Sequence, residues 1–348
     1  MNPAADFIRK KFREYYRKRG VMAPEGMEKR EFGFGNDKKI DYRHLSFTKN
    51  EELNNYFVTN SPLYASFSSA YYEFPGAQPM PKKNMLAADL IFEFDAECHH
   101  DSLTCRECLD KAKHDTQRLI DDFLIPDFGF DRKDIKITFS GSRGYHLYVV
   151  NEEVKHLNGE ARRAIVDYLQ AKNLDVKSII RGGATLKSKG WRGRLAKAAY
   201  DYVKTSEEKK FMEKEEILKK MSEGNYDLFR GAHSFWDKML NEQIIHLGSA
   251  IDQSVTIDIS RLIRLPSTLH GGSSLLCMYI DNLDKFDPFR DAVVFYNPPM
   301  KIKFTKDVSE FVLKEQTLGP FKVGEEKNVP EYAALYLICK ETAIPSIL

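Results

Sequence analysis

The segment at residues 86–95 constrains this chain most, because it alternates in the manner of a β-strand with one buried face. Leu90, Phe92 and Phe94 fall on one side of such a strand, and Glu93 and Asp95 fall on the other. Neighbouring carboxylates repel each other unless a cation joins them. Two divalent metal ions about 3.5–4 Å apart are the usual solution in nucleotidyl transfer. The alternation alone is also typical of a strand end with solvated acids, so it indicates a metal site only together with other features.

A cluster of cysteines and histidines follows this strand. Cys98, Cys105 and Cys108 lie within eleven residues, and His99 and His100 stand between the first two cysteines. A Cys-x2-Cys pair with an upstream cysteine and histidine supplies the four ligands that suit tetrahedral Zn²⁺. No ligand position is left open, so we expect a structural zinc knuckle at residues 98–108 rather than a catalytic zinc. Either histidine could complete it.

A short polar turn at residues 140–144 joins two expected strands, residues 135–139 and 145–150. Glycines let a backbone approach an anion closely, and the side chains of the turn and of the residues after it can donate hydrogen bonds to phosphate oxygens. These side chains are Ser140, Ser142, Arg143 and His146. The segment is neither a Walker A loop nor a dinucleotide-binding fingerprint. A simple hairpin connection is the alternative to a phosphate-binding turn.

A further segment combines acidic and basic side chains. Asp252 and Asp258 are an even number of residues apart within residues 250–259, which have the character of a strand, so a regular strand would place both on one face. Arg264 and His270 flank a turn that contains a proline. Either aspartate could complete a metal site, or could instead cap a loop or the following helix.

The remaining pattern predicts an α/β (α+β) fold whose sheet is contributed discontinuously. Helices are expected near residues 112–124 and 154–169, and another strand near residues 275–280. Residues 174–241 are mostly helical in pattern and strongly charged, which is typical of an inserted helical subdomain. The expected organisation is therefore residues 1–173 as the first part of a core with the knuckle, residues 174–241 as the inserted subdomain, and residues 242–348 as the second part of the core with a C-terminal tail.

The charge of the chain is close to neutral as a whole and uneven along its length. There are 53 Lys+Arg against 51 Asp+Glu, a formal net charge of +2, which by itself says nothing about a nucleic-acid partner. Residues 161–197, however, contain ten basic and two acidic side chains, with Trp191 among them. Such a stretch is typical of a surface that binds a phosphate backbone, and equally of a solvated helix face.

Membrane and secretory classes are not supported. No apolar run approaches the length of about 18 residues that a transmembrane helix needs. The basic N-terminal residues lack the apolar stretch of a secretory signal, and an amphipathic helix is predicted there from the stripe Phe7, Ile8, Phe12, Tyr15 and Tyr16. Five cysteines are a poor disulfide framework, so a reducing, cytoplasmic location is expected, with Cys277 and Cys339 as free thiols.

Taken in this order, the motifs resemble the catalytic (small) subunit of archaeal and eukaryotic DNA primases. The resemblance covers most of residues 28–290, and residues beyond 300 match poorly. It rests on residues 30–34 (Arg-Glu-Phe-Gly-Phe), Tyr42 and Arg43, residues 90–95, the cysteine cluster, residues 127–130 (Asp-Phe-Gly-Phe), residues 140–146, residues 251–252 and residues 265–270. It implies a primase-type catalytic core with mixed sheets flanked by helices and a zinc knuckle beside it.

The resemblance also implies roles for single residues. The paired acidic motif of the family falls on Glu93 and Asp95 and its third carboxylate on Asp252, and these would hold catalytic Mg²⁺ or Mn²⁺. The nucleotide-binding residues of the family fall on Arg43, Ser140, Ser142, Arg143, His146, Arg264 and His270. The structural zinc ligands fall on Cys98, His100, Cys105 and Cys108, with His100 favoured over His99.

One position departs from the family pattern. The family usually has Asp-x-Asp, whereas this chain has Glu93-Phe94-Asp95. Glutamate still ligates Mg²⁺ or Mn²⁺, but its additional methylene group moves the carboxylate by about one bond length, and active sites tolerate a misplacement of about 1 Å poorly. Asp95-Ala96-Glu97 is an alternative register for the acidic pair.

The activity that the resemblance implies is that of a DNA primase. Such an enzyme makes short primers from nucleoside triphosphates on a single-stranded DNA template by two-metal nucleotidyl transfer. A primase large subunit is the implied partner within the replication machinery, since this chain has no iron–sulfur type of cysteine set. Two alternatives remain: a non-catalytic zinc-containing subunit that binds nucleic acid, and a repair-type polymerase of the same superfamily, which differs in whether synthesis begins without a primer.

Overall fold

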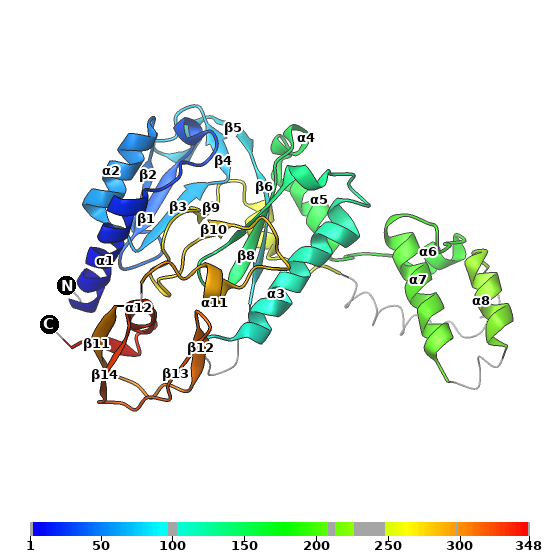
Figure 1. The fold of residues 1–348 in the computed structure, drawn as a ribbon. Coiled ribbons are helices and arrows are strands. Elements are labelled where there is room, and N and C mark those ends of the chain that lie inside the picture. The colour runs from blue at the N-terminus through cyan, green and yellow to red at the C-terminus, as the bar shows by residue number, and fades with distance from the viewer. Residues whose placement is uncertain (1–2, 97–102, 208–212, 226–247, 297, 347–348) are drawn as a thin grey trace. The chain divides into compact units, whose positions relative to one another are not determined.

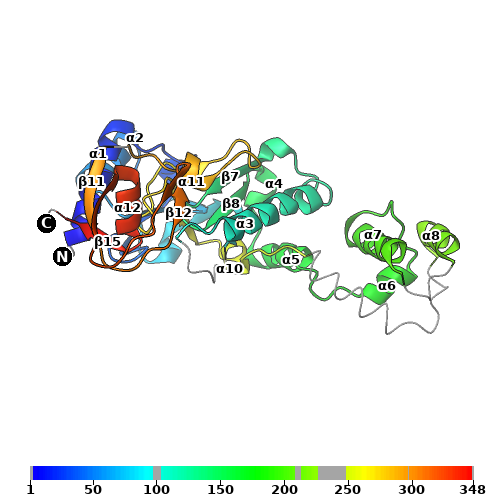
Figure 2. The ribbon, with the colours of Figure 1, turned by 60° about the horizontal axis from the view of Figure 1, so that its bottom comes forward.

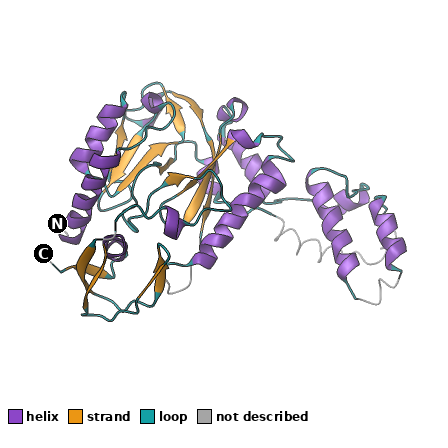
Figure 3. Ribbon diagram, viewed as in Figure 1, coloured by secondary structure: helices purple, strands orange, loops and turns teal. Residues whose placement is uncertain are grey.

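The computed structural model describes residues 3–96, 103–207, 213–225, 248–296 and 298–346. The chain forms two compact units (Figure 1). The first unit comprises Met1–Thr116, Lys133–Arg162 and Asp252–Leu348, and the second comprises Gln117–Arg132 and Arg163–Ile251. Helices and several small antiparallel sheets make up the described residues, which confirms the mixed α/β class (Figure 3).

Two four-stranded antiparallel sheets form the centre of the first unit. The first has the strand order β2-β1-β3-β9, and the second has the order β10-β7-β8-β6. The strands of the first are β1 (Phe32–Gly35), β2 (Tyr42–Leu45), β3 (Tyr64–Ser68) and β9 (Leu262–Arg264). Those of the second are β6 (Leu90–Asp95), β7 (Ile135–Phe139), β8 (Gly144–Val149) and β10 (Met278–Tyr279). Each sheet includes one strand from late in the chain, so the predicted discontinuous contribution is confirmed.

The pairing of β6 with β8 sets the register of the second sheet. Glu93 lies opposite His146, and Asp95 lies opposite Gly144. Leu90, Phe92 and Phe94 are buried, as the alternation predicts. The strand expected at residues 86–95 is divided, because residues 85–88 form a separate strand that pairs elsewhere. That strand, β5 (Met85–Ala88), forms a two-stranded sheet with β4 (Ala70–Tyr72).

The prediction of a strand at residues 250–259 is wrong. A short helix, α10 (Gln253–Ile257), occupies this segment. The carboxylate of Asp252 accepts a hydrogen bond from the Ser254 amide at 2.8 Å and so caps the helix, as aspartate commonly does at this position. Val255 and Thr256 are buried, which is one helical face rather than alternate residues of a strand.

Helices of the first unit pack beside its sheets. The predicted amphipathic helix is α1 (Pro3–Arg19), in which Ile8, Phe12 and Tyr16 are buried. Tyr16 also accepts a hydrogen bond from the Leu269 amide through its hydroxyl oxygen. The other helices and single turns here are α2 (Asn50–Asn60), α3 (Arg106–Arg118), α4 (Glu152–Lys155), α11 (Pro288–Asp291), η1 (Met27–Lys29), η2 (Met80–Lys83) and η4 (Arg132–Asp134). The chain continues from the first unit into the second through α5 (Gly159–Leu169).

The C-terminal part of the first unit is a small sheet with a buried helix. The sheet has the order β14-β11-β15, formed by β11 (Pro299–Phe304), β14 (Glu326–Pro330) and β15 (Ala343–Pro345). A hairpin of β12 (Phe311–Leu313) and β13 (Gln316–Leu318) and the helix α12 (Glu331–Cys339) complete it. Cys277 and Cys339 are free thiols, as predicted. Among the described residues, no helix is both long enough and apolar enough to cross a membrane.

The second unit is helical in its described part. It contains the π-helical turn η3 (Leu119–Leu124) and the helices α6 (Val176–Arg181), α7 (Gly190–Thr205) and α8 (Lys214–Ser222). The last three gather around a small apolar core (Figure 2) formed by Val176, Leu195, Ala199, Val203 and Met221. These helices lie within residues 174–241, whose extent as an inserted subdomain stays a prediction because residues 226–247 lie outside the described part.

The basic stretch at residues 161–197 includes arginines that serve the fold. Arg162 is 1% exposed, and its guanidinium donates hydrogen bonds to the carbonyl oxygens of Leu157, Asp89 and Ala88 at 2.9, 2.8 and 2.7 Å. In the second unit, Arg194 forms an ion pair with Asp127 at 2.6 Å. Neither interpretation of this stretch, a phosphate-binding surface or a solvated helix face, holds for Arg162, because its guanidinium is buried and bonded to backbone carbonyls.

Replacing Arg162 with methionine should destabilise the protein, because several buried carbonyl groups lose their hydrogen-bond donors. We expect a loss of about 3 kcal/mol in the free energy of unfolding, measured by urea denaturation. Arg163→Met is the matched control, since Arg163 is exposed and adjacent in sequence. Equal stability of the two variants would show that the Arg162 hydrogen bonds contribute nothing to the fold.

Candidate functional site

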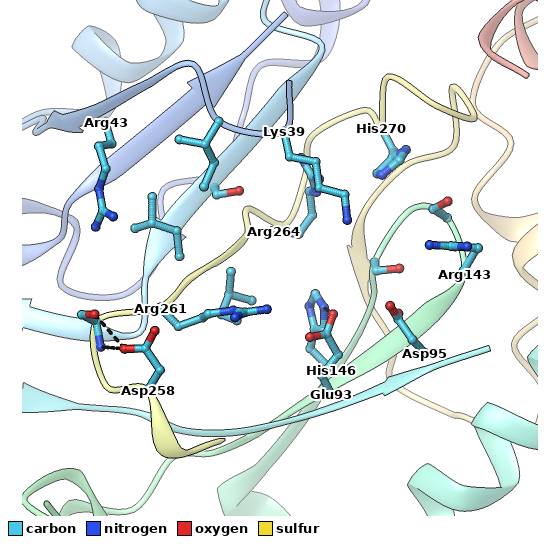
Figure 4. A pocket seen from close by; sticks show the side chains of 17 residues that line it. Lys39, Arg43, Glu93, Asp95, Arg143, His146, Asp258, Arg261, Arg264 and His270 are labelled. Carbon is cyan, nitrogen blue, oxygen red and sulfur yellow. Dashed lines mark hydrogen bonds and ion pairs between the residues drawn. The ribbon is translucent and has the colours of Figure 1, made fainter. Parts of the chain in front are cut away.

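A pocket of about 380 Å³ in the first unit brings together side chains from both four-stranded sheets (Figure 4). Its polar lining comes from segments that are far apart in the sequence. These residues are Lys39, Arg43, Ser66, Glu93, Asp95, Ser140, Ser142, Arg143, His146, Asp258, Ser260, Arg261, Arg264 and His270. The pocket thus contains both members of the predicted acidic pair and every predicted nucleotide-binding residue.

Glu93 and His146 form the contact at the base of this site. They face each other across the β6–β8 pairing, and His146 Nε2 lies 3.2 Å from Glu93 Oε1. Burial by itself would raise the pKa of Glu93, but the hydrogen bond to His146 and the positive charges around it hold that pKa below its usual value. Glu93 is therefore kept ionised at neutral pH.

Asp95 stands two residues further along the same strand, where its partner is Gly144. Loss of solvent around the carboxylate raises the pKa of Asp95, and the negative charge of Glu93 adds to this. The pairing of Asp95 with Gly144 also explains why a glycine occupies position 144. A Cβ atom on Gly144 would lie 2.2 Å from the Phe94 carbonyl oxygen and 2.5 Å from Asp95 Oδ1. Only glycine permits this close approach of the turn to the carboxylate.

The pocket has more positive than negative side chains. Five lysines and arginines line it, against three carboxylates. Arg43 is held by the buried carboxylate of Glu31, with its Nε at 2.8 Å from Glu31 Oε1. Within the described part of the chain, no carboxylate forms an ion pair with Lys39, Arg143 or Arg261. Figure 4 shows these three side chains reaching into the pocket from different segments. Their charges are thus available to an anionic ligand.

Two further predicted residues, Arg264 and His270, line a wall of the pocket that is less exposed than the side formed by Lys39. Arg264 is buried in β9, lies over the ring of Tyr64 and donates to the Ala65 carbonyl oxygen at 3.4 Å. His270 accepts a hydrogen bond from the Gly272 amide through Nδ1 at 3.1 Å. Burial, together with the positive charge of Arg264, lowers the pKa of His270 well below its ordinary value. A neutral ring that accepts at Nδ1 carries its proton on Nε2, so it can donate one hydrogen bond.

The two aspartates of the 250–259 segment are separated by the structure. Asp252 is not among the residues that line the pocket, and its carboxylate caps α10. Its amide donates to the Glu93 carbonyl oxygen at 3.1 Å, so Asp252 lies beside the strand that carries the acidic pair. Asp258 follows α10 and does line the pocket. One of its oxygens accepts from the amide and the hydroxyl of Ser260 at 2.9 and 2.7 Å.

The predicted zinc ligands are only partly described. Cys98 and His100 lie outside the described residues, as do His99 and Glu97. Cys105 directly precedes α3, and Cys108 lies three residues later in its first turn. In the parts of the chain that the structure covers, no three His, Cys, Asp or Glu side chains are grouped closely enough to hold a metal ion.

Some residues of the pocket were not predicted. Lys39 lies in the loop between β1 and β2, Arg261 follows Asp258, and Ser66 comes from β3. Arg261 stands at the start of the segment that carries Arg264, so its position was visible in the sequence. Nothing in the sequence marked Lys39 as a pocket residue, because an exposed lysine in a polar loop belongs to no periodic pattern.

The chemistry available here is that of binding a polyanion next to two carboxylates. Unpaired cations and a hydrogen-bond donor at His270 suit phosphate oxygens. Neighbouring carboxylates suit hard divalent cations, which prefer oxygen ligands. These two features occur together in enzymes that transfer phosphoryl or nucleotidyl groups.

Comparison with known proteins agrees with this chemistry. The family model described as "DNA primase small subunit" matches residues 94–281. The chain is 34% identical to the DNA primase small subunit PriS of Methanothrix thermoacetophila, over 96% of this chain and 97% of that protein. It is 33% identical to the DNA primase small subunits PriS of Methanosarcina barkeri, over 98% and 97%, and Archaeoglobus fulgidus, over 97% of each.

The depressed pKa of His270 predicts a pH dependence of stability. The unfolded chain takes up a proton on this residue near pH 6.5, whereas the folded chain does not, so stability should fall as the pH drops below that value. In His270→Gln this contribution disappears, which flattens the curve of unfolding free energy against pH by up to about 1.4 kcal/mol per pH unit. Urea denaturation between pH 5 and 8 measures it.

The exposed His156 provides the control for this experiment. His156→Gln should leave the pH dependence of the wild-type protein unchanged. A His270→Gln variant with the same pH dependence as the wild type would contradict a neutral His270 in the folded chain.

Proposed function

The chain belongs to the DNA primase small subunit family, and from this premise we propose that it joins nucleoside triphosphates into short primers on a single-stranded DNA template. The observation that supports this most is the pocket itself. It places Glu93 and Asp95 beside lysine and arginine side chains that have no carboxylate partner among the described residues.

The proposed role of the basic wall is to bind the triphosphate. Arg143 is the last residue of the β7–β8 turn, to which Ser140 and Ser142 add hydroxyl donors. Arg264 and His270 provide a fixed cation and a neutral hydrogen-bond donor on the more enclosed side. Because these groups are held in place before the ligand arrives, they stabilise developing negative charge without first having to reorganise.

The acidic pair fits the divalent cation that the family implies, because Mg²⁺ is commonly held by one or two carboxylates together with substrate phosphates. Two carboxylates on one strand end, one of them with a pKa raised partly by the charge of the other, form a donor set that a divalent ion would stabilise. Mg²⁺ or Mn²⁺ held there would activate the attacking hydroxyl group and offset the charge of the triphosphate. His146 keeps Glu93 ionised and oriented for this role. We propose Asp252, the position that the resemblance assigns, as the third carboxylate, because its amide donates to the Glu93 carbonyl oxygen at 3.1 Å and so places it beside the acidic pair. Asp258, which lines the pocket, is the alternative.

We also propose that zinc organises the segment before α3. The described half of the site fits this role, since Cys105 and Cys108 are three residues apart at the start of a helix, where their side chains share a face. Cys98 and His100 would complete four ligands, and the ion would hold the knuckle without taking part in the reaction.

The proposed partners follow from the family. A small subunit implies a large subunit, and the names of the relatives specify DNA as the nucleic acid. We propose that the chain works with a primase large subunit in the replication machinery, with single-stranded DNA as template and nucleoside triphosphates as substrates.

The function is tested by incubating the protein and its large subunit with single-stranded DNA, labelled nucleotides and Mg²⁺ or Mn²⁺. Asp95→Asn should reduce template-dependent product by at least about 100-fold, since the site loses a charged ligand. DNA binding without any product from the wild-type protein would instead favour the non-catalytic alternative. Product that forms only when a primer is supplied would favour a repair-type polymerase.

The third carboxylate is tested by a matched pair of variants in the same assay. Asp252→Asn should reduce product by at least about 100-fold although asparagine keeps the helix cap, because the site loses a charged ligand, whereas Asp258→Asn should change it less than about threefold. The reverse result would assign the role to Asp258.

The zinc site is tested by the metal content of the purified protein. We expect one zinc ion per chain, and a loss of most of it in Cys108→Ser together with a lower melting temperature, since metal binding is coupled to local folding. Cys339→Ser is the control, as Cys339 is a free thiol. Protein without zinc, or equal zinc content in both variants, would contradict the knuckle.

A further inference from the structure

The loop between β1 and β2 is built to hold one conformation. Asp41 accepts hydrogen bonds through its carboxylate from the amides of Asn36, Asp37 and Lys38, at 2.7, 2.9 and 3.2 Å. Its own amide donates to the Phe34 carbonyl oxygen at 2.8 Å, which ties the end of the loop to its start. These backbone hydrogen bonds hold the pKa of Asp41 below its usual value. A charged carboxylate thus organises an otherwise exposed turn.

The loop also folds back over the end of β1. A Cβ atom on Gly35 would lie 1.9 Å from the Lys38 carbonyl oxygen, so no other residue fits there without moving the loop. The Asn36 side-chain oxygen accepts from the Leu63 amide at 3.3 Å and fastens the loop to the next segment. The backbone position of Lys39, the next residue, is therefore fixed by the hydrogen bonds and close contacts of the loop.

That residue, Lys39, points into the pocket. Figure 4 shows its side chain extending from the loop into the space that Arg143 and His270 also border. Within the described part of the chain it has no ion-pair partner. It approaches from the first sheet, whereas Arg143 comes from the second.

We propose that Lys39 is a nucleotide-binding residue that contacts the triphosphate from the wall opposite the β7–β8 turn. This inference rests on the proposed function and adds to it a binding loop that neither the motifs nor the family resemblance assigned. A lysine ammonium is a point charge on a flexible stem, so it can follow the phosphates while the rigid loop fixes its base. Asp41 is then a positioning residue, since it acts through the loop.

The experiment compares Lys39→Gln with Lys38→Gln, the neighbouring exposed lysine that does not line the pocket. Binding of ATP with Mg²⁺ is measured by titration calorimetry, and the KM and kcat for nucleotides are measured in primer synthesis with the large subunit. Lys39→Gln should weaken ATP binding and raise KM by about 5- to 20-fold, with kcat changed less than about twofold. Lys39→Arg should retain most of the affinity, and Lys38→Gln should match the wild type.

Two further measurements separate a phosphate contact from a structural effect. The loss in Lys39→Gln should be smaller for AMP than for ATP, and it should shrink as salt is raised, because the lysine is exposed and its charge is screened. Asp41→Asn should also raise KM, since the loop loses its charged acceptor.

The outcomes distinguish the inference from the proposed function. If the wild-type protein binds ATP or makes primers and Lys39→Gln does the same with unchanged affinity and KM, the inference is wrong and the function stands. If no primers form but ATP binding depends on Lys39, the function is wrong and the contact stands. Equal losses in Lys38→Gln and Lys39→Gln would also overturn the inference.

Discussion

The antiparallel pairing of β6 with β8 is the constraint on which the rest of the site depends. One register places Glu93 against His146 and Asp95 against Gly144. A slip by a single residue would turn the carboxylates to the opposite face of the sheet and bring apolar side chains into the pocket. The absent Cβ of Gly144 allows the turn to pass close to Asp95, and that turn presents Arg143. The acidic pair and Arg143 are therefore positioned by the same pairing of strands.

Charge in the first unit is arranged around this pairing from distant parts of the chain. Lys39 arrives from the first sheet, Arg143 from the second and Arg261 from the segment after α10. The near-neutral charge of the whole chain therefore does not reveal a pocket in which cations outnumber carboxylates. The charge of a local stretch of sequence did not identify the binding residues either. Arg162 lies in the basic stretch at residues 161–197, but its guanidinium donates its hydrogen bonds to backbone carbonyls.

Periodic features of the fold could be predicted from the sequence, and single positions that depend on capping or loops could not. The alternation of Leu90, Phe92 and Phe94 predicted a strand, and the stripe of α1 predicted a packed helix, because burial imposes those periods. The spacing of Asp252 and Asp258 could not tell a strand from a capped helix. Only the hydrogen bond from the Ser254 amide decides which aspartate is used for the cap. Lys39 could not be predicted as a pocket residue, because its position depends on a loop conformation that Asp41 and Gly35 together determine.

The central claim is that this one pocket binds both the triphosphate and the divalent cation. A crystal structure of the protein with a non-hydrolysable nucleoside triphosphate and Mn²⁺, using the anomalous scattering of manganese, tests it most directly. The account predicts manganese within about 2.0–2.4 Å of carboxylate oxygens of Glu93 and Asp95, with phosphate oxygens on Arg143 and His270. Manganese or triphosphate bound away from these side chains, with the pocket empty, would contradict it.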